Sequence, residues 1–222
     1  MRICWYGHAA FMIQGLNERG QQRRVILDPY NYPGCGGYLP INEGADIVSI
    51  SHDNPRYHSD ISAIKGKFKL AKPLEFIGQQ RKIEGVTFSS HLVFENLERE
   101  GPNAMVRFDL DSISVAHLGD LGHPLDEEAL EFLSGIDILL ALAGGPPTIE
   151  LTDLLILIEK LQPAIVIPMH FRTQKVNLNI QPLKDLLALW RGAVLQTEDS
   201  QYTIDRATVP TETTLLVLDH AR

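Results

Sequence analysis

The feature that most constrains this chain is a set of polar residues that directly follow short apolar runs. The run Ile47-Val48-Ser49-Ile50 is typical of a buried strand, and Ser51-His52-Asp53-Asn54-Pro55-Arg56-Tyr57-His58 comes straight after it. Similar runs end at Ser90-His91, at His117 and at His170. The end of a strand is where α/β proteins usually place their chemistry. Four such ends in one chain therefore indicate one common site.

Composition and charge narrow the class of protein. With 222 residues, 44% of them hydrophobic, the chain can bury a full core. Its net charge of −8 argues against a nucleic acid or an anionic membrane as partner. The two cysteines, Cys4 and Cys35, do not form a zinc-type pair and are too few for a disulfide framework. No apolar run is long enough to cross a bilayer. We therefore expect a cytoplasmic protein that acts on a small molecule.

The order of the expected elements predicts an α/β fold. The first half favours short strands, near residues 3–6, 9–13, 24–27, 46–50, 86–89, 104–110 and 112–116. Between two of them, residues 92–101 are expected to form an exposed hairpin or loop at the border of a site. The second half alternates helices at 125–130, 152–161 and 182–190 with strands at 136–142, 164–168 and 213–218. Two sheet-rich halves with helices on their outer faces predict a four-layer αββα sandwich, formed by one domain over residues 1–222.

Four of the residues at strand ends have the chemistry of metal ligands. His52, His91, Asp120 and His170 offer imidazole and carboxylate groups, which bind zinc, manganese or iron when deprotonated. The alternative is that each histidine only caps its strand and bonds a neighbouring carbonyl. The joint occurrence of all four favours the metal site.

Several longer motifs carry a resemblance to a known family. They are Trp5-Tyr6-Gly7-His8-Ala9-Ala10-Phe11, Leu27-Asp28-Pro29-Tyr30, His117-Leu118-Gly119-Asp120-Leu121-Gly122-His123 and Ile167-Pro168-Met169-His170-Phe171-Arg172-Thr173. Their order resembles the metallo-β-lactamase superfamily over nearly the whole chain, and in particular its ascorbate-6-phosphate-lactonase-like hydrolases. The resemblance implies the αββα fold, metal-dependent hydrolysis and a capacity to form homo-oligomers.

The family's metal-binding loop, Ser-His-x-His-x-Asp-His, is altered in this chain. Its first histidine matches His52, but its second falls on Asn54, its aspartate on Arg56 and its last histidine on Tyr57. His58 stands one residue late, so that a local bulge would be needed to bring it in.

By this resemblance the first metal position keeps His52, His91 and Asp120, with Asn54 as a weak carbonyl ligand. The second position keeps only Asp120 and His170. Asp120 would also be the catalytic residue that orients the attacking water.

Arg56 leaves two arrangements open. A guanidinium about 5 Å from a divalent ion would be repelled by roughly 6–7 kcal/mol at an effective dielectric constant of about 20. If Arg56 points inward, its charge replaces the second metal and pairs with Asp120. If it points outward, the first position can still hold one ion.

Other residues have a functional and a structural interpretation. His123 orients a ligand or only begins a helix before Pro124, and Arg172 contacts an anionic substrate or only solvent. Asp28 is a partner of a ligand or a turn residue. For His8 we expect a structural role in the N-terminal strands.

Two functions follow. The first is a hydrolase of an ester, lactone or phosphoester, with a reduced site that holds one divalent metal, zinc or manganese. The second is a metal-free member of the family that has lost the hydrolytic centre and binds a ligand or serves a structural role. The four surviving residues, His52, His91, Asp120 and His170, favour the first.

Overall fold

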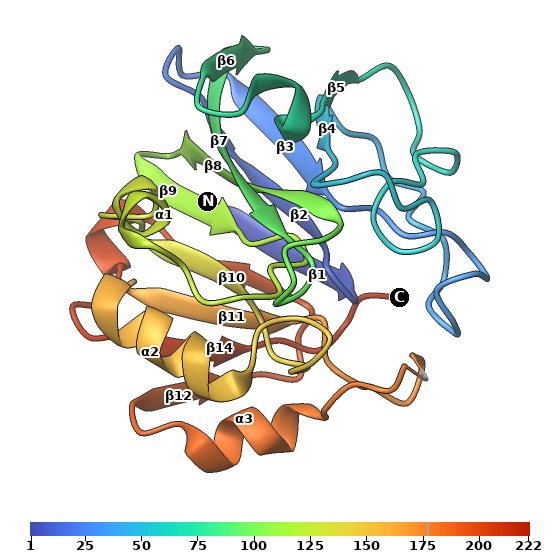
Figure 1. Cartoon of the computed structure of the whole chain (residues 1–222). Coiled ribbons are helices and arrows are strands. Elements are labelled where there is room, and N and C mark those ends of the chain that lie inside the picture. The colour runs from blue at the N-terminus through green and yellow to red at the C-terminus, as the bar shows by residue number, and fades with distance from the viewer. Residues whose placement is uncertain (177) are drawn as a thin grey trace.

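Two β-sheets face each other in the computed structural model, which describes residues 1–176 and 178–222 (Figure 1). The first sheet has the strand order β13-β1-β2-β3-β4-β5. Its strands are β1 (Arg2–Gly7), β2 (Ala10–Leu16), β3 (Gln22–Leu27), β4 (Ile47–Ser49), β5 (Lys69–Ala71) and β13 (Gln201–Thr203). Strands β1, β2 and β3 are antiparallel, whereas β3, β4 and β5 run parallel.

The second sheet has the strand order β12-β14-β11-β10-β9-β8-β7-β6. Its strands are β6 (Gln80–Ile83), β7 (Val86–Phe94), β8 (Pro102–Leu110), β9 (Ile113–His117), β10 (Ile138–Leu142), β11 (Ile165–Met169), β12 (Ala193–Gln196) and β14 (Thr214–Val217). Strands β9, β10, β11, β14 and β12 are parallel, and α1, α2 and α3 connect β9 to β10, β10 to β11 and β11 to β12, as expected for crossover connections. Their carboxyl ends therefore lie at one end of the molecule.

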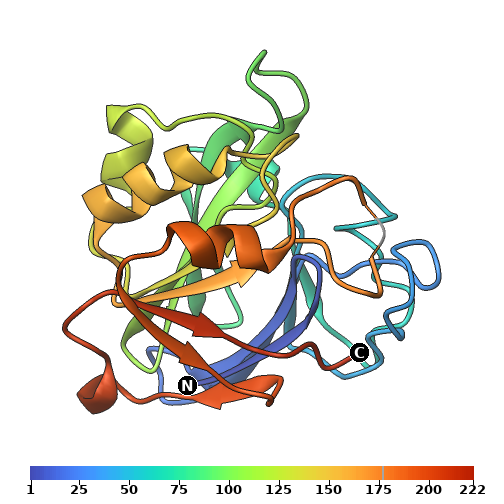
Figure 2. The ribbon, with the colours of Figure 1, turned by 90° about the horizontal axis from the view of Figure 1, so that it is seen from below.

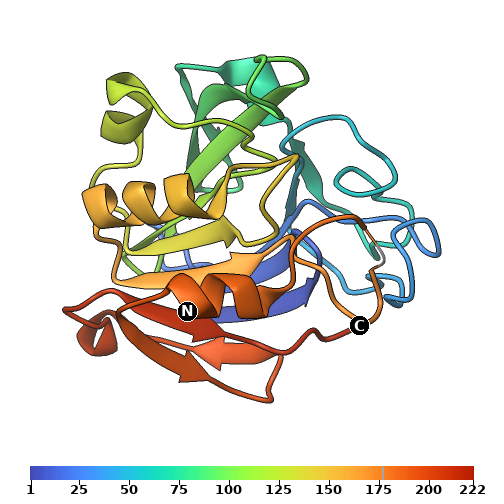
Figure 3. The same cartoon turned by 60° about the horizontal axis from the view of Figure 1, so that its bottom comes forward.

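The three α-helices cover the second sheet. They are α1 (Glu127–Phe132), α2 (Leu151–Leu161) and α3 (Leu183–Leu189), and Figures 2 and 3 show them on the side of the yellow-to-red strands, away from the blue-to-cyan loops. Helix α1 begins at Asp126, whose carboxylate accepts a hydrogen bond from the Ala129 N–H. Helix α2 buries one stripe of apolar residues, Leu151, Leu154, Leu157 and Ile158. None of the helices in the described residues is long and apolar enough to span a membrane.

The first sheet is buried on both faces, although no α-helix in the described residues precedes α1. In β1 the side chains of Ile3 and Trp5 enter the core between the sheets, and those of Cys4 and Tyr6 enter a second core on the opposite face. Irregular segments between residues 30 and 64 supply the other side of this second core, with the side chains of Tyr30, Cys35, Tyr38, Ile41, Ala45 and Ile64.

The α/β sandwich predicted from the sequence is therefore confirmed. The expectation that helices cover both outer faces was wrong, because loops form the outer layer on the first sheet.

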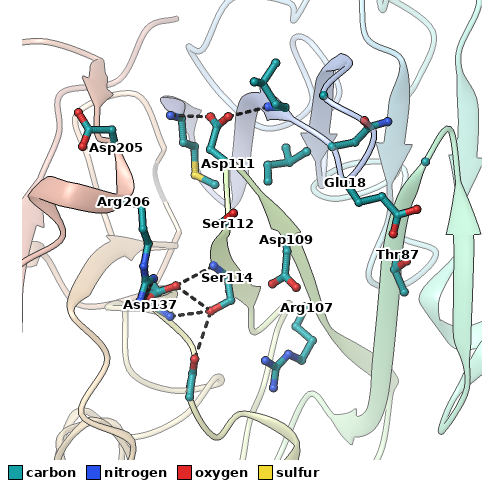
Figure 4. A pocket seen from close by; sticks show the side chains of 17 residues that line it. Glu18, Thr87, Arg107, Asp109, Asp111, Ser112, Ser114, Asp137, Asp205 and Arg206 are labelled. Atoms are coloured by element: carbon teal, nitrogen blue, oxygen red, sulfur yellow. Dashed lines mark hydrogen bonds and ion pairs between the residues drawn. The ribbon is translucent and has the colours of Figure 1, made fainter.

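The end of the sandwich opposite the carboxyl ends of β9 to β11 is hollowed by a pocket of about 1130 Å³ (Figure 4). Two of the carboxylates that line this pocket form ion pairs with other lining residues. Asp111 binds the amino group of Met1, and Asp137 binds Arg206 and Ser114. These contacts join the two sheets at that end of the molecule.

We predict that Leu140→Ala lowers the free energy of unfolding by about 2–5 kcal/mol, because Leu140 is fully buried in β10 at the centre of the second sheet. The measurement is equilibrium denaturation in urea. The control is Ile156→Ala on α2, whose side chain is 50% exposed and which should change the same free energy by less than about 0.5 kcal/mol. Equal losses in the two variants would contradict this description of the core.

Candidate metal centre

Five polar residues follow the ends of strands from both sheets. Asp28 follows β3 and His52 follows β4, while Asp120 follows β9 and His170 follows β11. His8 lies in the turn between β1 and β2. All five are buried, and their positions bring polar groups of the two sheets together at one end of the sandwich.

The centre of this site is formed by His52, His58 and Asp120. Their ligand atoms lie within 4.8 Å of one another. Asp120 Oδ2 is 2.9 Å from His58 Nε2 and 3.9 Å from His52 Nε2. The sequence-predicted residues His52 and Asp120 are thus brought together, and His58 joins them.

A second group consists of His8, His58 and His170, whose ligand atoms also lie within 4.8 Å of one another. His170 Nε2 is 3.4 Å from Asp120 Oδ1, so the two groups adjoin. The rings of His8 and His170 are 4.3 Å apart between centroids.

A tight turn explains how His58 reaches the site despite its late position in the loop. The carbonyl oxygen of Asn54 accepts hydrogen bonds from the N–H groups of Tyr57, His58 and Ser59, at 3.1, 2.8 and 3.1 Å. The turn takes up the additional residue and directs the His58 side chain inward. The side chain of Asn54 makes no hydrogen bond in the described residues, and the backbone carbonyl is the part of Asn54 that shapes the site.

Asp28 fixes the orientation of His58 from the other side. Its Oδ2 atom is 3.1 Å from His58 Nδ1 and accepts a hydrogen bond of 2.6 Å from the Ser51 hydroxyl, while Oδ1 accepts one of 2.7 Å from the Ser51 N–H. With Nδ1 donating to this carboxylate, Nε2 is the His58 atom that faces Asp120. Asp28 is therefore a partner of a candidate ligand, one of the two alternatives that its position in the sequence left open.

Asn103, which the sequence analysis did not identify, orients His52 in the same way. Asn103 Oδ1 is 3.2 Å from His52 Nδ1, and Asn103 Nδ2 donates to the Leu118 carbonyl at 3.0 Å. The bond to Leu118 fixes which end of the amide meets the histidine. A proton on His52 Nδ1 then leaves Nε2 free for a ligand.

The field at the site attracts positive charge. Burial opposes the charged form of His58, but the carboxylates of Asp120 and Asp28 outweigh it and raise the pKa of His58 to about 10. Burial likewise opposes ionisation of Asp120, but His58 and His170 hold its pKa well below the usual value. Burial lowers the pKa values of His8 and His170, and so favours their neutral forms.

A divalent metal ion fits these residues. Five buried side-chain atoms at the site have no hydrogen-bond partner in the described residues: His8 Nδ1 and Nε2, His52 Nε2, His170 Nδ1 and Asp120 Oδ1. Buried polar atoms are nearly always hydrogen-bonded, so such a group requires an explanation. Neutral imidazoles around one carboxylate are a donor set for zinc, manganese or iron.

The prediction that His91 is a ligand was wrong. His91 lies on β7 and packs its ring 5.5 Å from that of Phe132 in α1, outside both groups of ligand atoms. Side chains alternate along a strand, and the position of His91 places it on the helix-covered face. The acidic group that β7 and its hairpin bring to the site is Glu95, whose Oε1 lies 3.6 Å from His52 Nε2.

Arg56 points outward, so it does not take the place of a metal ion. Its Nε donates to the Gly34 carbonyl at 2.7 Å, and its guanidinium lies 5.0 Å from the ring centroid of Tyr57. Tyr57 lines the site instead, with its ring 5.2 Å from that of His8. Arg172 is exposed, and in the described residues its side chain makes no contact with the site.

His123 holds the hairpin that carries Glu95. Its Nε2 accepts a hydrogen bond from the Phe94 N–H at 3.2 Å, and its Nδ1 faces the Pro124 carbonyl at 2.8 Å. Gly122 packs so tightly here that an added Cβ would come within 2.0 Å of the Glu95 carbonyl oxygen. His123 therefore acts on the site through the hairpin.

The chain is similar to known proteins of one superfamily. A family model described as "Beta-lactamase superfamily domain" matches residues 2–170. The chain is 27% identical over 207 residues to a UPF0173 metal-dependent hydrolase of Methanoculleus marisnigri, covering 83% of this chain and 87% of the relative. It is 24% identical over 194 residues to another from Thermoplasma acidophilum, covering 78% and 84%.

The fold is also similar to solved structures. A crystal structure from Thermotoga maritima, described as a candidate zinc-dependent hydrolase of the metallo-β-lactamase superfamily, gives a TM-score of 0.77 at 26% identity and covers 98% of this chain and 99% of that one. A crystal structure from Parabacteroides distasonis, described as a candidate metal-dependent hydrolase, gives a TM-score of 0.59 at 16% identity and covers 84% of this chain and 86% of that one.

We predict that Asp28→Asn weakens the binding of zinc by about 10–100-fold, because the carboxylate that orients His58 is lost. The measurement is competition of the purified protein with a chelating dye. Asp60→Asn is the control, since the Asp60 carboxylate accepts hydrogen bonds from Asn31 and Ser62 away from the site. A folded Asp28→Asn variant with the affinity of the parent would refute this role.

Proposed function

The chain belongs to the β-lactamase superfamily and has the metallo-β-lactamase fold, and from this premise we propose that it is a metal-dependent hydrolase. The names of its relatives support the proposal, since those with 23–27% identity are called metal-dependent hydrolases. The observation that carries it is the convergence of His52, His58 and Asp120, where His52 Nε2 and Asp120 Oδ1 have no hydrogen-bond partner among the described residues.

His52, His58 and Asp120 would hold the ion, with His170 at its border. A divalent metal bound there lowers the pKa of water and polarises the scissile group of a substrate. Asn103 and Asp28 keep the two imidazoles in the orientation in which Nε2 faces the centre. The protein thus supplies the ligands in a fixed arrangement before an ion binds.

Besides holding the ion, Asp120 would orient the attacking water. Its pKa lies well below the usual value, so the side chain stays a carboxylate at neutral pH. Its Oδ1 atom has no hydrogen-bond partner in the described part of the chain and can accept a hydrogen bond from an attacking water, which orients that water. Glu95, 38% exposed, lies between His52 and solvent and is the acidic group that an entering substrate would meet.

For the finer assignment, we propose an ester, lactone or phosphoester as substrate and zinc or manganese as the metal. The imidazole-rich donor set with one carboxylate suits both ions. The sequence motifs support lactonase-like chemistry of the ascorbate-6-phosphate-lactonase type. A small-molecule substrate, a cytoplasmic location and assembly into a homo-oligomer belong to the same proposal.

We predict that the chelated protein regains hydrolysis when zinc or manganese is added. Asp120→Asn should lower kcat by at least about 100-fold, because the variant loses the negative charge of the ligand and replaces the carboxylate that orients the water with a neutral, weaker acceptor. The measurement is the rate of hydrolysis of a p-nitrophenyl ester, a lactone and bis-p-nitrophenyl phosphate. Asp109→Asn, which changes an exposed carboxylate on β8, is the control and should keep the parent rate.

The alternative function, a metal-free family member, predicts a different result. Neither metal would then bind, and hydrolysis of the three substrates would not depend on added ion. That outcome would overturn the hydrolase proposal in favour of a ligand-binding or structural role.

A further inference from the structure

His8 has an unusual environment for a residue in a strand-to-strand turn. Its side chain is 1% exposed, and in the described part of the chain neither buried ring nitrogen has a hydrogen-bond partner. Its φ angle is +51°, in the left-handed region. Its carbonyl oxygen accepts hydrogen bonds from the Trp5 indole and the His170 N–H, both at 3.0 Å, and these bonds fix the backbone.

This arrangement destabilises the folded state unless the ring nitrogens of His8 bind a further group. An unpaired buried polar group costs about 1–3 kcal/mol, and a left-handed φ at a residue other than glycine adds strain. Glycine or asparagine would serve the turn alone at lower cost. The identity of the side chain at position 8 therefore points to an interaction that its nitrogens make.

The neighbours of His8 indicate what that interaction is. Its ring centroid lies 4.3 Å from that of His170 and 5.2 Å from those of His58 and Tyr57. The ligand atoms of His8, His58 and His170 lie within 4.8 Å of one another, and all three side chains are buried. Three imidazoles at this separation form the ligand set of a tetrahedral zinc site that keeps one position open, once a binding ion displaces the proton on His58.

We propose that His8 is a metal ligand, and that with His58 and His170 it forms an all-histidine position for a divalent cation beside Asp120. The inference rests on the proposed function, because it concerns the same centre. The turn between β1 and β2 would in this way supply a donor that the altered loop lacks at Asn54 and Arg56.

His58 belongs to both groups of candidate ligands, and this limits the number of metal ions that one chain can bind. Its Nδ1 is held by Asp28, so Nε2 is the atom that it offers to either group. One imidazole nitrogen has one lone pair and binds one ion. The position formed with His8 and the position formed with His52 therefore compete for His58, and one chain binds one ion tightly.

The test compares His8→Phe with His91→Phe in the full chain. His8→Phe keeps an aromatic ring beside Tyr57 and removes both nitrogens, and His91→Phe makes the same change at a histidine outside both groups. The chelated proteins are titrated with Zn²⁺ against a competing chelator and with Co²⁺ followed by its visible absorption. We expect one ion per chain in the parent, a loss of roughly 100-fold or more in affinity with a changed cobalt spectrum in His8→Phe, and parent behaviour in His91→Phe.

Thermal unfolding separates a ligand from a structural residue. A ligand role predicts that His8→Phe unfolds in chelator at a temperature no lower than the parent, since an unpaired buried polar group is removed. It also predicts that added zinc raises the unfolding temperature less in this variant than in the parent. An equal fall of the unfolding temperature with and without zinc would show that His8 only supports the fold.

The two proposals fail in different ways. If the parent binds one ion and His8→Phe binds it with the same affinity and cobalt spectrum, the role of His8 is refuted and the hydrolase proposal stands. If the parent binds neither ion, the hydrolase proposal fails, and the role of His8 fails with it.

Discussion

The structure depends on one buried line of charges that joins the two sheets. Asp28 follows a strand of the first sheet, Asp120 follows a strand of the second, and His58 lies between them at 3.1 and 2.9 Å. Two buried carboxylates are unfavourable unless positive charge is close. The rest of the site serves this requirement, because the turn at Asn54 directs His58 inward and Ser51 satisfies the remaining oxygens of Asp28. The negative charge of Asp28 and Asp120 that stabilises protonated His58 would also attract a divalent ion.

The backbone is strained at several residues of the candidate site. His8, Asp28 and His170 all have φ angles in the left-handed region, and each directly follows a strand. Hydrogen bonds hold them there: the His170 N–H donates to the His8 carbonyl at 3.0 Å, and the Asp28 N–H donates to the Ser49 carbonyl at 2.9 Å. Strain of this kind persists only where the surroundings fix it, and it is concentrated at functional sites. Here it turns three side chains into the space between the ends of the sheets.

The sequence predicted the central strands and the end of the molecule at which the site lies, because buried strands produce apolar runs that stop at polar residues. It missed β5, β6, β12 and β13, each of which lies at an edge of its sheet and so lacks a continuous buried run.

Three residues of the candidate site could be predicted from the ends of strands, namely His52, Asp120 and His170. His91 was misassigned because the position of a motif does not tell which face of the strand a residue occupies. His58 was obscured by the offset of one residue in its loop. Asn103 carries no local signal, since only the packing of β8 against the segment after β4 brings it near His52. Glu95 lies in the 92–101 segment that was expected to border a site, but nothing in the sequence singled it out from its neighbours.

The altered loop is only one source of candidate ligands in this site, since His8, Asp120 and His170 come from other segments. A metal centre of this fold gathers donors from several strand ends, so a donor lost in one segment can be offset by another that is distant in sequence.

The free-energy cost of the unpaired buried atoms favours a centre that still binds metal. Five buried atoms at the site have no hydrogen-bond partner in the described residues, and at about 1–3 kcal/mol each their total cost is comparable to the stability of a whole domain. In a chain that had lost its metal, substitutions that remove such atoms would stabilise the fold, and no function would oppose them. Histidines at positions 8, 52, 58 and 170 are hard to explain in that case, whereas a bound cation would satisfy their nitrogens.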